Sequence, residues 1–326
     1  MKNSWLGILI CSFFIAGCGQ SADNGKLRIG MMPKLVGISY FDATQQGAEE
    51  LDVTLVYDGP TQASSTEQSQ MINGWVSQGF DVIAVAPNDP DGISKTLANA
   101  KSSGVTVLTW DTDANAEKSN RTVFVNQAPN EALAKSLVDA MARGAGEDGK
   151  LKGKYLIVSG TPTASNQNTW IELMKTHLEA DHPDCELVPI LYPGEDQRKA
   201  QVQTAEALSA HDDLRGIWGL TSVALPAAAR AVRDIERANE IYVTGLSLPS
   251  LMREYVKDDT VKEFVLWDAV ALGYLSVHVA KRLHEDGLKP GRYDMGRLKN
   301  IEVTKDEVIL GPPLIFNNDN IDEFKF

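Results

Sequence analysis

Lys34, Asp111 and Asn166 each follow a short apolar segment of this chain, and other polar and aromatic residues stand at similar places. An ionised Asp accepts hydrogen bonds strongly, Asn and Gln donate and accept, and Lys only donates. Aromatic rings with a few placed polar groups are the usual walls of a small-molecule site. Such a set suits a sugar, whose hydroxyls donate and accept and whose ring faces are weakly apolar. We therefore predict a site formed by Lys34, Tyr40, Phe41, Asn88, Asp111, Asn166, Gln167, Asn168, Trp170, Ser222, Ser247 and Asp268.

The apolar segments that precede these residues are short, rich in β-branched residues and bounded by turn signals, which is typical of β-strands. The predicted strands are 27–31, 53–57, 82–86, 105–109, 155–159, 187–191, 216–219, 242–245, 261–266, 301–304 and 308–310. Amphipathic stretches predict helices near 42–51, 66–79, 90–103, 129–144, 167–181, 197–210, 223–238, 248–257 and 268–286. This alternation predicts parallel βαβ units, arranged as two successive doubly wound α/β units.

In open parallel sheets, ligands bind in the crevice beyond the carboxyl ends of the strands, so residues that follow strands can converge on one cleft. Each of them also has a structural alternative. An Asp or Asn after a strand is often the N-cap of the next helix, and Asn166, Ser222 and Ser247 are plausible caps. A Trp or Phe at a strand end often belongs to the core. The convergence of so many such residues favours a cleft.

Motifs that would carry enzyme chemistry are missing from the sequence. It contains no GxxxxGK[ST] phosphate loop and no GxSxG nucleophile elbow. The GAGEDG run at 144–149 has the GxGxxG spacing, but it lies in a predicted loop from a helix to a strand, whereas the dinucleotide fingerprint opens a helix after a strand. His177, His182 and Cys185 lie near one another, but their spacing matches no standard zinc site. We therefore predict a binding protein with no cofactor and no metal. A sugar enzyme that uses Asp111 and Asp268 as paired carboxylates stays open as an alternative.

The N-terminus has the pattern of an export signal. Lys2 supplies a positive charge, residues 6–16 are apolar but too short to span a bilayer, and Gly17 precedes Cys18. The ending Ile-Ala-Gly-Cys resembles the bacterial lipobox, which implies cleavage after residue 17 and lipidation of Cys18. An ordinary signal with a chance Cys is the alternative. We expect a signal peptide at 1–17, a tether at 18–25 and an extracytoplasmic, lipid-anchored protein.

The composition of the chain limits which classes of function and domain organisation remain possible. The formal net charge is −13, which argues against nucleic-acid binding because that function needs a basic face. The apolar fraction of 43% is enough for sizeable cores, and the length after cleavage suits two domains. Once Cys18 is lipidated, Cys185 is the one thiol left in the mature chain, so no internal disulfide can form.

The mature chain resembles the ribose-type, or type I, periplasmic binding proteins of ABC importers, and within them the branch that binds rhamnose or a furanosyl autoinducer. The segments that carry the resemblance recur in order at 33–37, 57–61, 108–113, 161–168, 225–229, 261–268 and 316–321. The resemblance implies two Rossmann-like lobes joined by a three-segment hinge that closes on ligand, with crossings near Asn126, Asp268 and Gly311. It implies lobes of 26–126 plus 269–310 and 127–268 plus 311–326.

The resemblance also implies the partners: a small neutral sugar, the permease and ATPase subunits of the importer, and the membrane through the lipid. We expect a monomer. Autoinducer-binding members use a Lys and an Asp that match Lys34 and Asp111. Their Asp-Gln pair is Asn166-Gln167 here, and their later Pro and Ala are Leu220 and Ser222.

These departures count against the autoinducer. The Asn-Gln-Asn run at 166–168 and the runs that begin at Thr221 and Val243 are more similar to the rhamnose-binding members. A rhamnose-like deoxyhexose is therefore the expected ligand, and the furanosyl autoinducer is the alternative.

Overall fold

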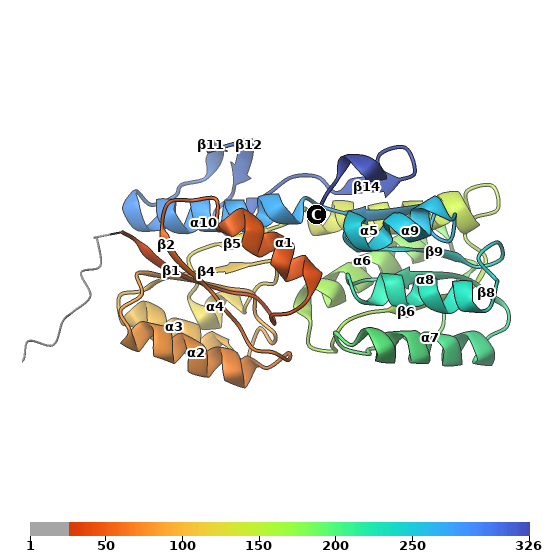
Figure 1. Ribbon diagram of the computed structural model, residues 1–326, viewed down its shortest axis with the longest axis horizontal. Coiled ribbons are helices and arrows are strands. Elements are labelled where there is room, and N and C mark those ends of the chain that lie inside the picture. Colours follow the sequence, from red (N-terminus) through yellow and green to blue (C-terminus); the bar gives the residue numbers. More distant parts are fainter. Residues whose placement is uncertain (1–25) are drawn as a thin grey trace, which may run out of the picture.

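The chain forms two sheets that lie side by side, each flanked by helices (Figure 1). The computed structural model describes residues 26–326. The first sheet contains β1 (Arg28–Met32), β2 (Thr54–Tyr57), β3 (Val82–Val85), β4 (Thr106–Trp110), β5 (Phe124–Asn126), β11 (Gly291–Met295), β12 (Leu298–Val303) and β13 (Glu307–Ile309). Its order is β11-β12-β13-β5-β4-β3-β1-β2, parallel from β13 to β2 and antiparallel between β11, β12 and β13.

Helices cover both faces of the first sheet. They are α1 (Ser39–Ala48), α2 (Ser65–Ser77), α3 (Ser94–Ser102), α4 (Ala116–Ser119) and α10 (Ala269–Glu285). Alternate residues of β3 enter two different cores: Val82 and Ala84 join the large core, while Ile83 and Val85 pack with residues of α2 and α3. A strand buried on both faces needs apolar residues at every position, which explains its continuous apolar sequence.

The second sheet has the order β7-β6-β8-β9 and is parallel throughout. Its strands are β6 (Gly153–Val158), β7 (Cys185–Leu187), β8 (Leu214–Gly219) and β9 (Tyr242–Gly245). An antiparallel pair of β10 (Glu263–Leu266) and β14 (Leu314–Asn317) adjoins it through a bridge between Leu246 and Val265. The helices of this lobe are α5 (Asn130–Ala145), α6 (Ser165–Asp181), α7 (Gln197–Ala210), α8 (Ala224–Asp234), α9 (Pro249–Lys257) and the 3-10 turn η1 (Ile321–Glu323).

Three short segments connect the two lobes: 127–129 after β5, 267–268 before α10, and 310–313 between β13 and β14. In Figure 1 α10 follows the second lobe in sequence but lies along the first, beside α1. The two helices approach closely because Gly47 and Gly273 face the partner backbone, where a Cβ atom would overlap it. The predicted α/β architecture of two lobes joined by three segments is confirmed.

Several boundaries and short elements differ from the prediction. α1 begins at Ser39 rather than near residue 42, α3 covers only 94–102, and α8 ends at Asp234. β5, β11 and β14 were not predicted. β5 has three residues, too few to produce a pattern, and β11 is an antiparallel edge strand with mostly exposed polar residues.

No helix within residues 26–326 has the length and apolar character that crossing a membrane requires. The signal peptide predicted at 1–17, the tether at 18–25 and Cys18 lie outside the described residues.

Candidate ligand-binding site

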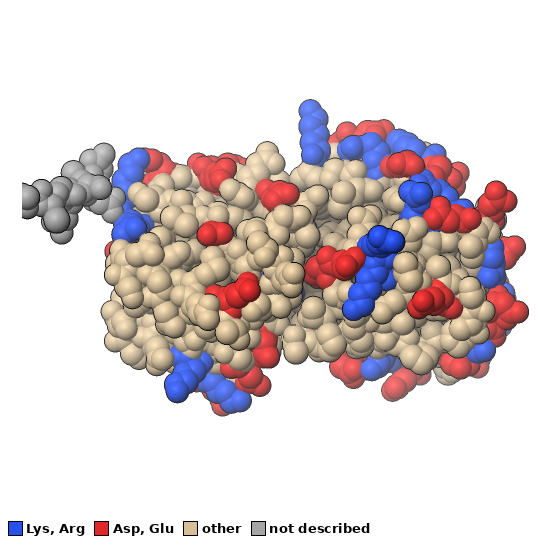
Figure 2. Space-filling model, turned by 60° about the horizontal axis from the view of Figure 1, so that its bottom comes forward, with Lys and Arg blue, Asp and Glu red and all other residues tan. Residues whose placement is uncertain are grey.

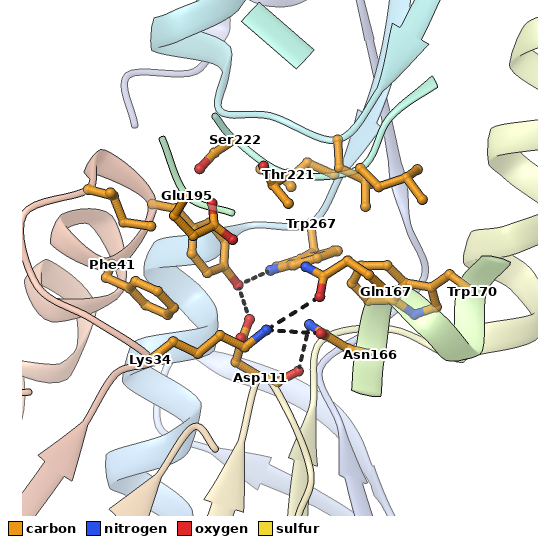
Figure 3. Close-up of a pocket in the computed structure, with 15 residues that line it drawn as sticks. Lys34, Phe41, Asp111, Asn166, Gln167, Trp170, Glu195, Thr221, Ser222 and Trp267 are labelled. Atoms are coloured by element: carbon orange, nitrogen blue, oxygen red, sulfur yellow. Dashed lines mark hydrogen bonds between the residues drawn. The ribbon is translucent and has the colours of Figure 1, made fainter. Parts of the chain in front are cut away.

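A pocket lies between the two lobes, where the carboxyl ends of strands from both sheets meet (Figure 3). It contains about 410 Å³ of space between protein atoms, including the part open to solvent. The lining residues are Lys34, Ile38, Tyr40, Phe41, Asp111, Asn166, Gln167, Trp170, Glu195, Leu220, Thr221, Ser222, Leu246, Leu266 and Trp267.

The first lobe contributes a cation, a carboxyl and two rings to the pocket. Lys34 follows β1, Tyr40 and Phe41 lie in the first turn of α1, and Asp111 follows β4. Asp111 has φ of +60°, in the left-handed region, which Asp and Asn enter more readily than other non-glycine residues. Backbone held in this region is often found at ligand sites.

The second lobe contributes amides and an indole from the start of α6. Asn166 and Gln167 lie in its first turn, and Trp170 follows one turn later. The Trp170 Nε1–H donates to Asn130 Oδ1 at 2.7 Å, which fixes the indole. Its ring centroid lies 5.9 Å from that of Trp267, so two indoles form one wall of the pocket.

Direct hydrogen bonds cross the pocket from one lobe to the other. Lys34 Nζ donates to Asn166 Oδ1 at 2.9 Å and to Gln167 Oε1 at 3.4 Å (Figure 3). Asp111 accepts from the Tyr40 hydroxyl at 2.6 Å, and that hydroxyl accepts from Trp267 Nε1 at 3.0 Å. The lobes are therefore closed on each other, with the polar groups of the pocket arranged as a connected network.

Four ionisable groups in the pocket have shifted pKa values. Burial lowers the pKa of Lys34, against the opposing effect of the Asp111 and Glu195 charges. Burial raises the pKa of Asp111 and of Glu195, while the Lys34 charge lowers both. Burial and the neighbouring Asp111 raise the pKa of Tyr40 well above its usual value, so its hydroxyl remains a donor at neutral pH.

Apolar side chains complete the walls. Tyr40 packs edge-on against Phe41 at a centroid distance of 5.1 Å and against Trp267 at 6.0 Å. The aliphatic part of the wall consists of Ile38, Leu220, Leu246 and Leu266. A ligand in this pocket meets aromatic and aliphatic surfaces on its faces and a small number of polar atoms at its edge.

Most of the residues predicted from the sequence come together in this pocket: Lys34, Tyr40, Phe41, Asp111, Asn166, Gln167, Trp170 and Ser222 line it. Four predicted residues do not. The Asn88 side chain donates to the Lys34 carbonyl at 2.7 Å, and the Asn168 side chain donates to the Pro162 carbonyl at 2.8 Å. Both amides are thus used to hold backbone.

Ser247 and Asp268 also satisfy local backbone instead of lining the pocket. The Ser247 hydroxyl donates to the Ser222 carbonyl at 3.3 Å. Asp268 is the N-cap of α10, because its carboxylate accepts from the Ala271 N–H at 2.8 Å. Asp111 lines the pocket and Asp268 does not, so the carboxylate pair of the enzyme alternative is not assembled there.

The predicted set of site residues did not include Glu195, Thr221 and Trp267, which line the pocket. Thr221 follows β8 and Trp267 follows β10, so the rule that identified Asp111 also pointed to them. Glu195 is separated from the predicted strand 187–191 by a Tyr-Pro-Gly turn, so its place in the sequence does not mark it as a residue at a strand end.

Among the described residues, no group of three or more His, Cys, Asp or Glu side chains is placed to hold a metal ion. His182 instead accepts the Leu151 N–H at its Nδ1 atom at 3.2 Å, which is a structural contact.

Comparison with known proteins places this architecture in a family. Residues 29–288 match the periplasmic binding protein domain family. LsrB from Clostridium saccharobutylicum in complex with AI-2 has a TM-score of 0.85 at 27% identity, over 91% of this chain and 99% of that chain. An ABC transporter solute-binding protein from Clostridium phytofermentas with bound L-rhamnose has a TM-score of 0.84 at 29% identity, over 91% and 98% of the two chains.

The D-xylose-binding periplasmic protein of Escherichia coli is 29% identical over 107 residues, and this match spans 30% of that protein's length. The family consists of binding proteins rather than enzymes. With its two lobes, its three connecting segments and its match over residues 29–288, the chain belongs to the periplasmic binding protein family.

Proposed function

We propose that this protein is the sugar-binding component of an ABC importer and holds a neutral monosaccharide, with a rhamnose-like deoxyhexose as first choice, between its lobes. The observation that supports this proposal most directly is the pocket, where polar groups of both lobes surround a space with aromatic walls. Lys34 and Asp111 come from the first lobe, and Asn166 and Gln167 come from the second. A ligand that binds both sets of groups favours the closed arrangement by its greater affinity for it.

The charges of the pocket support a neutral, hydroxyl-bearing ligand. One ammonium group, Lys34, faces the carboxyls of Asp111 and Glu195. An anionic ligand would therefore meet two carboxyls and a single cation that already neutralises part of their charge. On the face drawn in Figure 2, Lys and Arg side chains are interspersed with acidic ones and form no continuous basic surface.

The aliphatic wall supports a deoxyhexose. Leu220, Leu246 and Leu266 can contact a methyl group, for which a sugar hydroxyl would be a poor substitute because it would lose its hydrogen bonds. The relative from Clostridium phytofermentas holds L-rhamnose. The furanosyl autoinducer is the second candidate, since LsrB from Clostridium saccharobutylicum holds AI-2. The resemblance of Lys34 and Asp111 to the autoinducer-binding members supports it.

We assign residues 26–126 plus 269–310 to one lobe and 127–268 plus 311–326 to the other, which turn about the three connecting segments. Saturating L-rhamnose is expected to reduce the radius of gyration measured by small-angle scattering, because the ligand stabilises the closed lobes. The same sample should melt at a higher temperature, by an amount that grows with ligand concentration. A radius and melting temperature that do not change for any neutral monosaccharide would contradict the proposal.

We also propose that Cys18 carries lipid, and that the mature protein is an extracytoplasmic monomer which delivers its ligand to permease and ATPase subunits. β1 begins at the end of the first lobe that is far from the second lobe, so a tether there would leave the pocket free (Figure 1). Mass spectrometry of the protein made in a bacterial host is expected to show acyl chains on Cys18, and Cys18→Ala should abolish membrane retention. Mature protein without acyl chains would refute the anchor.

A further inference from the structure

One carboxyl oxygen of the pocket is buried without a hydrogen bond. Glu195 lines the pocket, and its Oε2 atom is buried without any hydrogen-bond partner in the described part of the chain. Buried polar atoms are nearly always hydrogen-bonded, and an unsatisfied one lowers stability. Glu195 therefore needs a function that offsets this cost.

The backbone around Glu195 holds the side chain in place. Leu191 pairs with Val158 in a parallel bridge, and the Gly194 N–H donates to the Gly160 carbonyl at 3.1 Å. Asp196 then caps α7 by accepting the Lys199 N–H at 2.9 Å. The Glu195 backbone is fixed on both sides, so its carboxyl is held in the pocket by the fold.

The neighbouring residues leave room for the carboxyl without satisfying it. A Cβ atom at Gly160 would lie 3.1 Å from Glu195 Oε1, so any larger residue there would crowd the carboxyl. Burial raises the pKa of Glu195, the Lys34 charge lowers it, and Asp111 and the Thr221 hydroxyl contribute smaller opposing effects. The surroundings therefore stabilise the carboxyl in part and leave its Oε2 atom without a hydrogen bond.

Two of the donors that line the pocket are used by other acceptors. Lys34 Nζ donates to Asn166 and Gln167, and the Tyr40 hydroxyl donates to Asp111. The Thr221 hydroxyl lies close enough to the Glu195 carboxyl to lower its pKa by hydrogen bonding, but Oε2 still has no partner among the described residues. A hydroxyl of a bound ligand can supply the donor that Oε2 lacks.

We propose that Glu195 is a specificity-determining residue that accepts a hydrogen bond from a hydroxyl of the ligand. Asp111 stands on the first lobe and Glu195 on the second, on opposite sides of the pocket (Figure 3). A ligand with hydroxyls at two edges engages both carboxyls, and closure completes the second contact. This role rests on the proposed function, because it requires a ligand that carries hydroxyl groups.

The test is a calorimetric comparison of L-rhamnose with its 2-, 3- and 4-deoxy analogues on wild type, Glu195→Leu and Glu195→Gln. Removing the hydroxyl that Glu195 binds is expected to weaken wild-type binding by about tenfold or more. Glu195→Leu should weaken L-rhamnose by a similar factor and bind that one analogue as well as the parent sugar. The other two analogues should bind Glu195→Leu more weakly than L-rhamnose does, by the same factors as in wild type. The matched control is Glu186→Gln, an exposed Glu of the same lobe, which should leave every affinity unchanged.

The melting temperature of the ligand-free protein separates recognition from a structural role. Because burial raises the pKa of Glu195, its ionised form destabilises the closed fold, and this cost is absent below the usual Glu pKa of about 4.3. Glu195→Gln should thus melt at or above the wild-type temperature at pH 7, with a smaller difference at pH 4. A lower melting temperature for both variants, or an equal loss for every analogue, would overturn the assignment.

Two failures are distinguishable. Suppose that wild type binds L-rhamnose, but that in Glu195→Leu every deoxy analogue still binds more weakly than L-rhamnose, by the same factor as in wild type. Only the role of Glu195 is then refuted. If wild type binds none of the four sugars nor any other neutral monosaccharide, the proposed function and the role of Glu195 both fall.

Discussion

Lys34→Met is expected to weaken ligand binding by at least about a hundredfold. Lys34 is 6% exposed, and its charge faces the carboxyls of Asp111 and Glu195. Removing one partner of a buried charge pair costs about 3–5 kcal/mol, because the remaining charge is left buried without compensation. Closure on the ligand brings these carboxyls together, so the substitution destabilises the closed, ligand-bound state. Each ~1.4 kcal/mol of this destabilisation weakens the affinity tenfold.

The loss has a defined dependence on pH. Burial raises the pKa of Asp111 and of Glu195, and without Lys34 the opposing effect is removed. Acid therefore neutralises both carboxyls and relieves the penalty, so the ratio of mutant to wild-type Kd should be smaller at pH 4.5 than at pH 7.5. Lys95→Met, an exposed Lys on α3, is the control and should bind normally. A Lys34→Met Kd within threefold of wild type would show that Lys34 is no part of the site.

Asp111→Ala is expected to weaken binding by roughly tenfold to a few hundredfold. The ionised carboxylate can accept from ligand hydroxyls, and a hydrogen bond to a charged group contributes about 1.5–3 kcal/mol. Asp111→Asn should be milder, since its amide oxygen still accepts from the Tyr40 hydroxyl or from the ligand. Calorimetry on the two variants gives the comparison.

Melting temperatures of the same variants control for the backbone. Asp111 has φ of +60°, which Asn tolerates well and Ala does not, so Asp111→Ala should also melt at a lower temperature while Asp111→Asn melts close to wild type. If Asp111 served only the backbone, Asp111→Ala would lose stability and keep the wild-type Kd. A Kd within about twofold of wild type for both variants would remove Asp111 from the binding residues.

The difference between Asp111 and Asp268 shows where the sequence rule stops. Both residues follow a strand, but α10 begins directly after Asp268, so its carboxylate reaches the free N–H groups of that helix. No helix begins until Ala116 after Asp111, and its side chain remains in the pocket. A position directly after a strand predicts that a residue lies at the edge of the sheet that faces the pocket. The distance to the next helix then decides whether its carboxylate caps that helix or lines the pocket.

The fold was largely predictable because most strands lie in parallel sheets with both faces buried. A strand such as β3 is apolar at every position, and the alternation with helices then determines the class of fold. Glu195 was not predicted because β7 ends at Leu187 and the chain reaches Glu195 through irregular backbone. Periodicity carries no signal through such a segment, and only three-dimensional packing places its side chains.

The most direct test of a neutral sugar as the ligand is a calorimetric titration of the purified protein with L-rhamnose at low and high salt, followed by recovery of the sugar. Binding of an uncharged ligand should depend little on ionic strength, because no ion pair to the ligand is screened. We predict saturable binding with closely similar Kd values at 50 mM and 500 mM salt, and L-rhamnose recovered chemically unchanged. Absence of binding for every neutral monosaccharide, together with binding of an anionic compound that weakens steeply with salt, would contradict it.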